Sequence, residues 1–119
     1  MSPKSRLRAL RCRLLIGYYG LRHVHSTAYI ALGSQISRDL VAAQYSYIGP
    51  GALIGPQVCI GAYTMFGPGV ICAGDDHRFD IPGTPTIFAG RPSMRPTKIG
   101  RDAWIGARSI ILSGVSVGD

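Results

Sequence analysis

The residues with the clearest chemical potential lie in the middle of the chain. His77 follows two aspartates, Asp75 and Asp76, in the stretch GDDHRFD. A neutral imidazole suits proton abstraction near neutral pH, because its pKa lies close to the working pH. The aspartates could orient the ring, as a third group often does for a catalytic base, or they could cap a turn. The chain contains no glutamate, so a general base would be His, Asp or another group.

Metal and disulfide chemistry have less support in the sequence. The three cysteines, Cys12, Cys59 and Cys72, are too few and too scattered for a disulfide framework or a zinc site. A zinc site of the carbonic-anhydrase kind needs about three clustered histidines, and the repeat region described below offers only His77. We therefore expect no metal, reduced thiols and a cytoplasmic location.

A six-residue repeat forms the scaffold that must position His77. Glycine directly follows many of the repeated apolar residues, and a second, mostly small residue lies four positions after each of them. A period of six excludes a helix, whose period is 3.6, and indicates short strands joined at glycine corners. The repeated apolar positions are Ile30, Ile36, Ala42, Ile48, Ile54, Ile60, Phe66 and Cys72, then Ile99, Ile105, Ile111 and Val117.

An insertion interrupts the repeat directly after His77. Cys72 and Ile99 are 27 positions apart, which is not a multiple of six, so residues 78–98 are predicted to be inserted. This segment is rich in proline and has no period; loops of this length in compact domains are often functional. Asp76 falls on a small inward position. Either the wall has ended by residue 76, or the carboxylate is paired, since an unpaired buried charge is costly.

The N-terminal residues 1–25 form a separate basic segment. They hold six cations and no acid, and we expect them to form a short helix that caps the open end of a β-helix domain at residues 26–119. The apolar run from Leu14 to Leu21 is too short to span a bilayer. The basic segment could meet a phosphate-rich ligand, an acidic partner or, weakly, a membrane surface, or it could present a solvated helix face. We expect no nucleic-acid partner.

The repeat, the histidine and the loop together resemble the hexapeptide-repeat acyltransferases. GDDHRFD is similar to the family's histidine motif, and IGRDAWIGARSIILSGVSVGD is similar to the segment after its protruding loop. The resemblance is nearest to the sugar and polysaccharide O-acetyltransferases and the xenobiotic acetyltransferases. It implies an all-β fold, a left-handed parallel β-helix of about four coils, each built from three hexapeptides.

The resemblance also implies a reaction and a set of site residues. His77 would act as general base, with Asp76 beside it, and acetyl-CoA would be the acyl donor. Trp104 would lie near the pocket, and Gly106 and Ala107 along the pantetheine arm. The site would lie between the subunits of a homotrimer. The acceptor would be the hydroxyl of a sugar, a glycan or, alternatively, a chloramphenicol-type small molecule.

The family usually continues with further coils and a C-terminal cap. We therefore expect this chain to be a C-terminally truncated form. The alternative to an enzyme is a non-catalytic β-helix scaffold that assembles or binds a partner.

Overall fold

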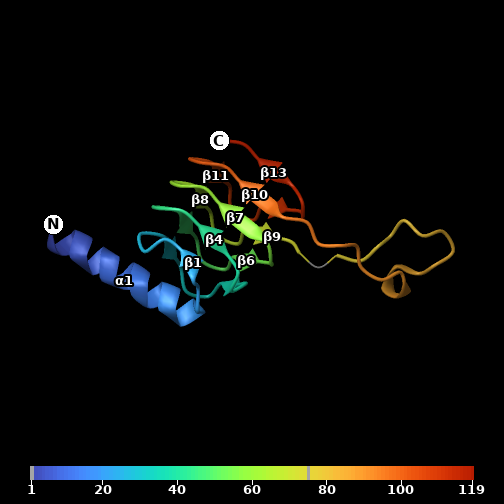
Figure 1. The fold of residues 1–119 in the computed structure, drawn as a ribbon, viewed down its shortest axis with the longest axis horizontal. Coiled ribbons are helices and arrows are strands. Elements are labelled where there is room, and N and C mark those ends of the chain that lie inside the picture. The colour runs from blue at the N-terminus through green and yellow to red at the C-terminus, as the bar shows by residue number, and fades with distance from the viewer. Residues whose placement is uncertain (1, 75) are drawn as a thin grey trace.

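The chain folds as one N-terminal helix followed by a three-sided parallel β-helix from which a single long loop protrudes (Figure 1). The computed structural model describes residues 2–74 and 76–119. The predicted parallel β-helix is confirmed, and its left-handed winding stays a prediction. In chain order the elements are α1 (Pro3–Tyr19), β1 (His23–Val24), β2 (Tyr29–Ile30), β3 (Gln35–Ile36), β4 (Val41–Ala42), β5 (Tyr47–Ile48), β6 (Leu53–Ile54), β7 (Val58–Ile60), β8 (Met65–Phe66), β9 (Ile71–Cys72), the 3-10 turn η1 (Thr86–Phe88), β10 (Thr97–Ile99), β11 (Trp104–Ile105), β12 (Ile110–Ile111) and β13 (Ser116–Val117).

Three parallel sheets make the walls of the β-helix. Their strand orders are β1-β4-β7-β10-β13, β11-β8-β5-β2 and β12-β9-β6-β3. Paired residues in neighbouring coils, such as Tyr29 and Tyr47, are 18 positions apart, which is three hexapeptides. Each strand is only two or three residues long because the chain turns a corner after every wall. The backbone groups are therefore satisfied between coils rather than within a local hairpin.

The predicted inward positions form the core. Most of the apolar series from Ile30 to Cys72 is buried, and Leu40, Ala52, Val58 and Val70 of the small series are buried with it. The polar members are satisfied by hydrogen bonds. The Thr64 hydroxyl donates to the carbonyl oxygen of Gly100 at 2.6 Å and accepts the N–H of Ala103 at 3.1 Å. A narrow apolar core running the length of the β-helix makes its walls a rigid support.

The insertion has the predicted length but different boundaries. Residues paired across it, such as Val58 with Thr97 and Met65 with Trp104, are 39 positions apart, which is 21 more than one coil. However, Thr97 and Lys98, predicted to belong to the insertion, lie in β10 and pair with Val58 and Cys59. The chain leaves the wall earlier, after β9. A periodic pattern counts inserted residues but does not say at which residue the chain departs.

Helix α1 is capped at both ends and packs on the first coil. The Ser2 hydroxyl accepts the N–H of Ser5 at 3.2 Å, and Gly20 ends the helix in the left-handed conformation at φ 66°. Cys12 and Leu15 are buried against the first coil. The predicted cap at residues 1–25 is too long, because β1 already begins at His23 and pairs with β4. In the described part of the chain, no helix has the length and apolar character needed to cross a membrane.

Candidate active site at the base of the loop

His77 lies where the chain leaves the β-helix, in the loop that follows β9. Its side chain is exposed, and it makes no hydrogen bond to any described residue. The next residue closes the neck of the loop, because the N–H of Arg78 donates to the carbonyl oxygen of Gly90 at 2.8 Å. The Arg78 guanidinium also pairs with Asp80, at 3.1 Å from its Nε to Oδ1. The imidazole is therefore exposed to solvent between the end of the wall and this closed part of the loop, where a ligand could reach it.

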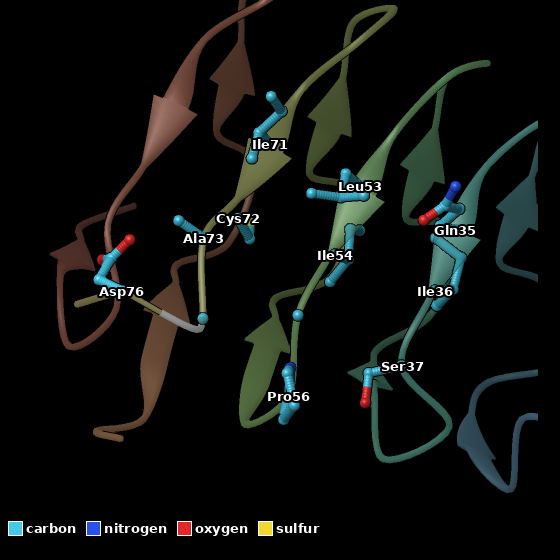
Figure 2. Close-up of a pocket in the computed structure, with 12 residues that line it drawn as sticks. Gln35, Ile36, Ser37, Leu53, Ile54, Pro56, Ile71, Cys72, Ala73 and Asp76 are labelled. Atoms are coloured by element: carbon cyan, nitrogen blue, oxygen red, sulfur yellow. The ribbon is translucent and has the colours of Figure 1, made fainter. Parts of the chain in front are cut away.

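A groove of about 560 Å³ runs from this corner across the outer side of β3, β6 and β9. Figure 2 shows Gln35, Leu53 and Ile71 in a row across these three strands, with Asp76 beyond β9. Pro56 and Ser37 lie along the corner side of the groove. The floor is thus mostly apolar, with an amide, a hydroxyl and a carboxylate at its margins. Such a surface suits an extended ligand with few polar groups.

Asp76 belongs to this groove and not to the core. Its side chain is exposed, so the wall has ended by residue 76, which is the first of the two predicted alternatives. Asp76 and His77, both described, form no hydrogen bond with each other, so the expected orienting contact is absent. Asp75, the other predicted partner of the imidazole, lies outside the described residues.

Cys72 lies under the same groove but is no nucleophile. It is buried on the inward side of β9, and burial raises the pKa of its thiol to about 11. A thiol in an apolar setting stays protonated near neutral pH and is inert. Across residues 2–74 and 76–119, no group of three or more His, Cys or Asp side chains could hold a metal ion.

The remaining predicted site residues lie elsewhere on the β-helix. Trp104 begins β11, on a different wall, and its side chain is 81% exposed. Gly106 and Ala107 form the turn that precedes β12, whereas His77 follows β9, the parallel neighbour of β12. The turn and the histidine therefore lie at opposite edges of one wall. A single chain does not bring His77 together with Trp104, Gly106 and Ala107.

Apart from Asp76, the groove residues were not predicted, although the sequence holds a signal for its outward row. Gln35, Leu53 and Ile71 are 18 positions apart, and each directly precedes an inward residue of the repeat. Successive strand residues point to opposite faces, so this row must face outward. Its position beside the base of the loop makes it part of a candidate site.

No known protein family matches the chain, and no curated protein matches it.

Proposed function

We propose that this chain is an acetyl-CoA-dependent O-acetyltransferase that uses His77 as general base on a hydroxyl of a sugar or polysaccharide precursor. The observation that carries the proposal is an exposed imidazole at the closed base of a protruding loop, beside an open groove of about 560 Å³. The resemblance to hexapeptide-repeat acyltransferases supports the choice of reaction. The free state of all three cysteines fits a reducing, cytoplasmic setting.

His77 would carry one proton from the acceptor hydroxyl to the departing CoA sulfur. Its neutral ring nitrogen takes the proton from the acceptor hydroxyl as the oxygen attacks the thioester carbon of acetyl-CoA. When the tetrahedral intermediate collapses, the C–S bond breaks, and the resulting imidazolium returns its proton to the CoA sulfur. The acetyl ester and free CoA thiol are the products. Cys72, which lies under the groove, would not compete as a thiolate, because burial raises the pKa of its thiol to about 11.

The groove would hold the acceptor. Its row of Leu53 and Ile71 supports the apolar face of a sugar ring, and Gln35 and Asp76 at its margins can bond hydroxyl groups. In this arrangement Asp76 orients the acceptor and not the imidazole. That role agrees with the lack of a hydrogen bond between Asp76 and His77.

Trp104, Gly106 and Ala107 would complete the site from another copy of the chain. Trp104 lies on a different wall, and Gly106 and Ala107 lie at the opposite edge of the β9–β12 wall from His77, so one chain cannot use both groups together. A homotrimer would bring the exposed Trp104 of one subunit toward the loop of the next. The acetyl-CoA arm would then run along the turn at Gly106 and Ala107.

The test is acetyl-CoA turnover, read as free thiol, with a panel of sugars and with chloramphenicol. Replacing His77 with alanine should lower acceptor-dependent release by about 10²- to 10⁴-fold, the usual contribution of a general base. His23→Ala is the matched control, since His23 is also exposed but lies in β1, and it should keep full activity. Unchanged turnover in His77→Ala would contradict the base role. Turnover with chloramphenicol alone would indicate a xenobiotic acetyltransferase.

The second candidate is a non-catalytic scaffold, favoured by the separation of the predicted site residues within one chain. It predicts a stable assembly that neither binds nor consumes acetyl-CoA. Sedimentation analysis together with acetyl-CoA titration separates the two functions, because the enzyme must bind the donor.

A further inference from the structure

Helix α1 has one face fixed to the β-helix. Cys12 and Leu15 are buried, Ile16 and Tyr19 pack against the same core, and the Tyr19 hydroxyl donates to the carbonyl oxygen of Ala31 at 2.8 Å. Two cations add to this attachment. The Arg11 guanidinium lies 5.1 Å from the ring centre of Tyr29, and that of Arg8 lies 5.8 Å from the ring centre of Tyr45. The orientation of α1 is therefore set by the coil beneath it.

The other side of α1 carries a second apolar stripe that nothing in the described chain covers. Leu7, Leu10, Leu14 and Tyr18 are between 55% and 74% exposed. Their spacing of three and four residues places them on one face of the helix. The stripe is about 16 Å long at 1.5 Å per residue. Four large apolar side chains held in a row on an anchored helix are unusual for a solvated surface.

The borders of the stripe are positive on both sides. At 3.6 residues per turn, Arg6 and Arg13 fall on one side of it, and Lys4 and Arg11 fall on the other. Residues 1–25 contain no acid, and the six aspartates of the chain all lie from residue 39 onward. Among the described residues, none forms an ion pair with Lys4, Arg6 or Arg13. The stripe and its borders thus match a surface that is apolar inside and negatively charged outside.

A groove of about 480 Å³ opens beside the stripe, between α1 and the wall formed by β11, β8, β5 and β2. Lys4, Arg8 and Arg11 line it from the helix, and Tyr29 and Tyr47 line it from β2 and β5. Phosphate oxygens suit such a cluster of lysine and arginine donors. The groove therefore adds a place for an anionic head group next to the apolar stripe.

We propose that α1 binds the surface of an anionic phospholipid bilayer, with Leu7, Leu10, Leu14 and Tyr18 inserted below the head groups. Helices of this design lie in the plane of the interface, with lysine and arginine contacting the lipid phosphates. A second copy of the chain fits the surface poorly, because two stripes packed together would bring arginines against arginines with no acid between them. The β-helix and its loop would then be carried at the membrane surface. This inference does not depend on acetyl transfer.

The test is flotation of the whole chain with vesicles of phosphatidylcholine, alone or mixed with phosphatidylglycerol. The double variant Leu10→Ser/Leu14→Ser should weaken binding to the mixed vesicles by about tenfold or more, since two apolar side chains no longer leave water. Ile110→Ser/Leu112→Ser is the matched control, because both of its residues are similarly exposed but lie on the far coil. It should bind as the unaltered chain does. Neither change removes a buried group, and circular dichroism checks that α1 is retained.

A charge variant tests the other half of the proposal. Arg6→Ala/Arg13→Ala should reduce binding to the mixed vesicles, and added salt should do the same, whereas Lys98→Ala/Arg108→Ala should have little effect. Three results would overturn the proposal. They are no binding to mixed vesicles, equal binding to both vesicle types, and binding that survives loss of Leu10 and Leu14. If light scattering instead shows that the leucine variant loses an oligomer, the stripe is an interface between chains.

Discussion

The Asp39 side chain joins two successive coils at the corner beside the groove. Its Oδ2 accepts the N–H of Gln57 at 2.8 Å, and its Oδ1 accepts the hydroxyl of Ser37 at 2.6 Å. Gln57 has a φ of 60°, so the side chain stabilises a strained turn. The hydrogen bond from Ser37 is the main reason that the pKa of Asp39 is lowered below its usual 3.8. The stability that Asp39 adds to this corner should therefore depend on pH.

Replacing Asp39 with asparagine should destabilise the fold in a pH-dependent way. A carboxyl whose folded pKa is lowered adds stability above its unfolded pKa, and this stability is lost as the pH falls through the folded value. At pH 7 the variant should lose about 1 kcal/mol, the usual net value of such hydrogen bonds. The loss should shrink below about pH 3.8. Urea unfolding at both pH values measures it. Asp102→Asn, whose side chain makes no such bond among the described residues, is the control, and an equal loss at both pH values would refute the mechanism.

At the scale of the element, the corners decide how closely the coils can stack. A Cβ on Gly61 would clash with the carbonyl of Gly100 and lie 2.7 Å from the amide nitrogen of Arg101 in the next coil. These are backbone atoms, which cannot move aside without separating β7 from β10. Glycine at this position is therefore required by close approach of the chain, as the hexapeptide pattern predicts.

Gly61→Ala should destabilise the β-helix, and Gly17→Ala should not. Gly61→Ala forces two coils apart, so we expect a loss of about 2 kcal/mol or more, the scale of overpacking in a dense structure. A Cβ on Gly17, in α1, meets nothing within 4 Å and should add about 0.5–1 kcal/mol of helix stability. Thermal unfolding of both variants measures the difference. Similar melting temperatures would contradict the view that the corners limit coil spacing.

The walls were predictable because each hexapeptide forms one strand of a wall, and its own sequence shows which of its residues point inward. The six-residue period located Ile48 and Phe66 in the core without any long-range information. The base of the loop was less predictable. Asp76, counted forward from Cys72, and Thr97, counted back from Ile99, fall on the same position of the six-residue repeat. Only the pairing of Thr97 with Val58 decides which of them lies in the wall. The candidate site is harder still, because periodicity places each residue on a wall but does not bring two walls together.

At the scale of the whole molecule, the protruding loop is an addition to a β-helix that is complete without it. Figure 1 shows the loop extending away from the coils, and most of residues 76–94 are exposed. The coils on either side of it keep their register, with Cys59 paired to Lys98 as if the insertion were absent. The coils therefore supply the stability and the groove, whereas the loop segment supplies His77, the proposed base.

Deleting residues 74–94 should leave the β-helix intact and abolish acetyl transfer. The deletion joins Ala73 to Arg95, removes the 21 additional residues and restores the 18-residue spacing between Val58 and Thr97. It also keeps the hydrogen bonds between Arg95 and Ser113. We expect a melting temperature within about 5 °C of the unaltered chain, equivalent to a change of about 1 kcal/mol or less. Loss of His77 removes the proposed base.

A second deletion controls for phase. Removing residues 74–97 takes away three further residues, including Thr97, and shifts β10 out of register with β7. A shift of the pairing by an odd number of residues, here three, turns inward side chains outward. This variant should therefore unfold at a much lower temperature. If both deletions unfold alike, the loop contributes to the stability of the coils and the separation of roles is wrong. If the in-phase deletion is stable and still transfers acetyl groups, the catalytic base lies on the coils and not in the loop.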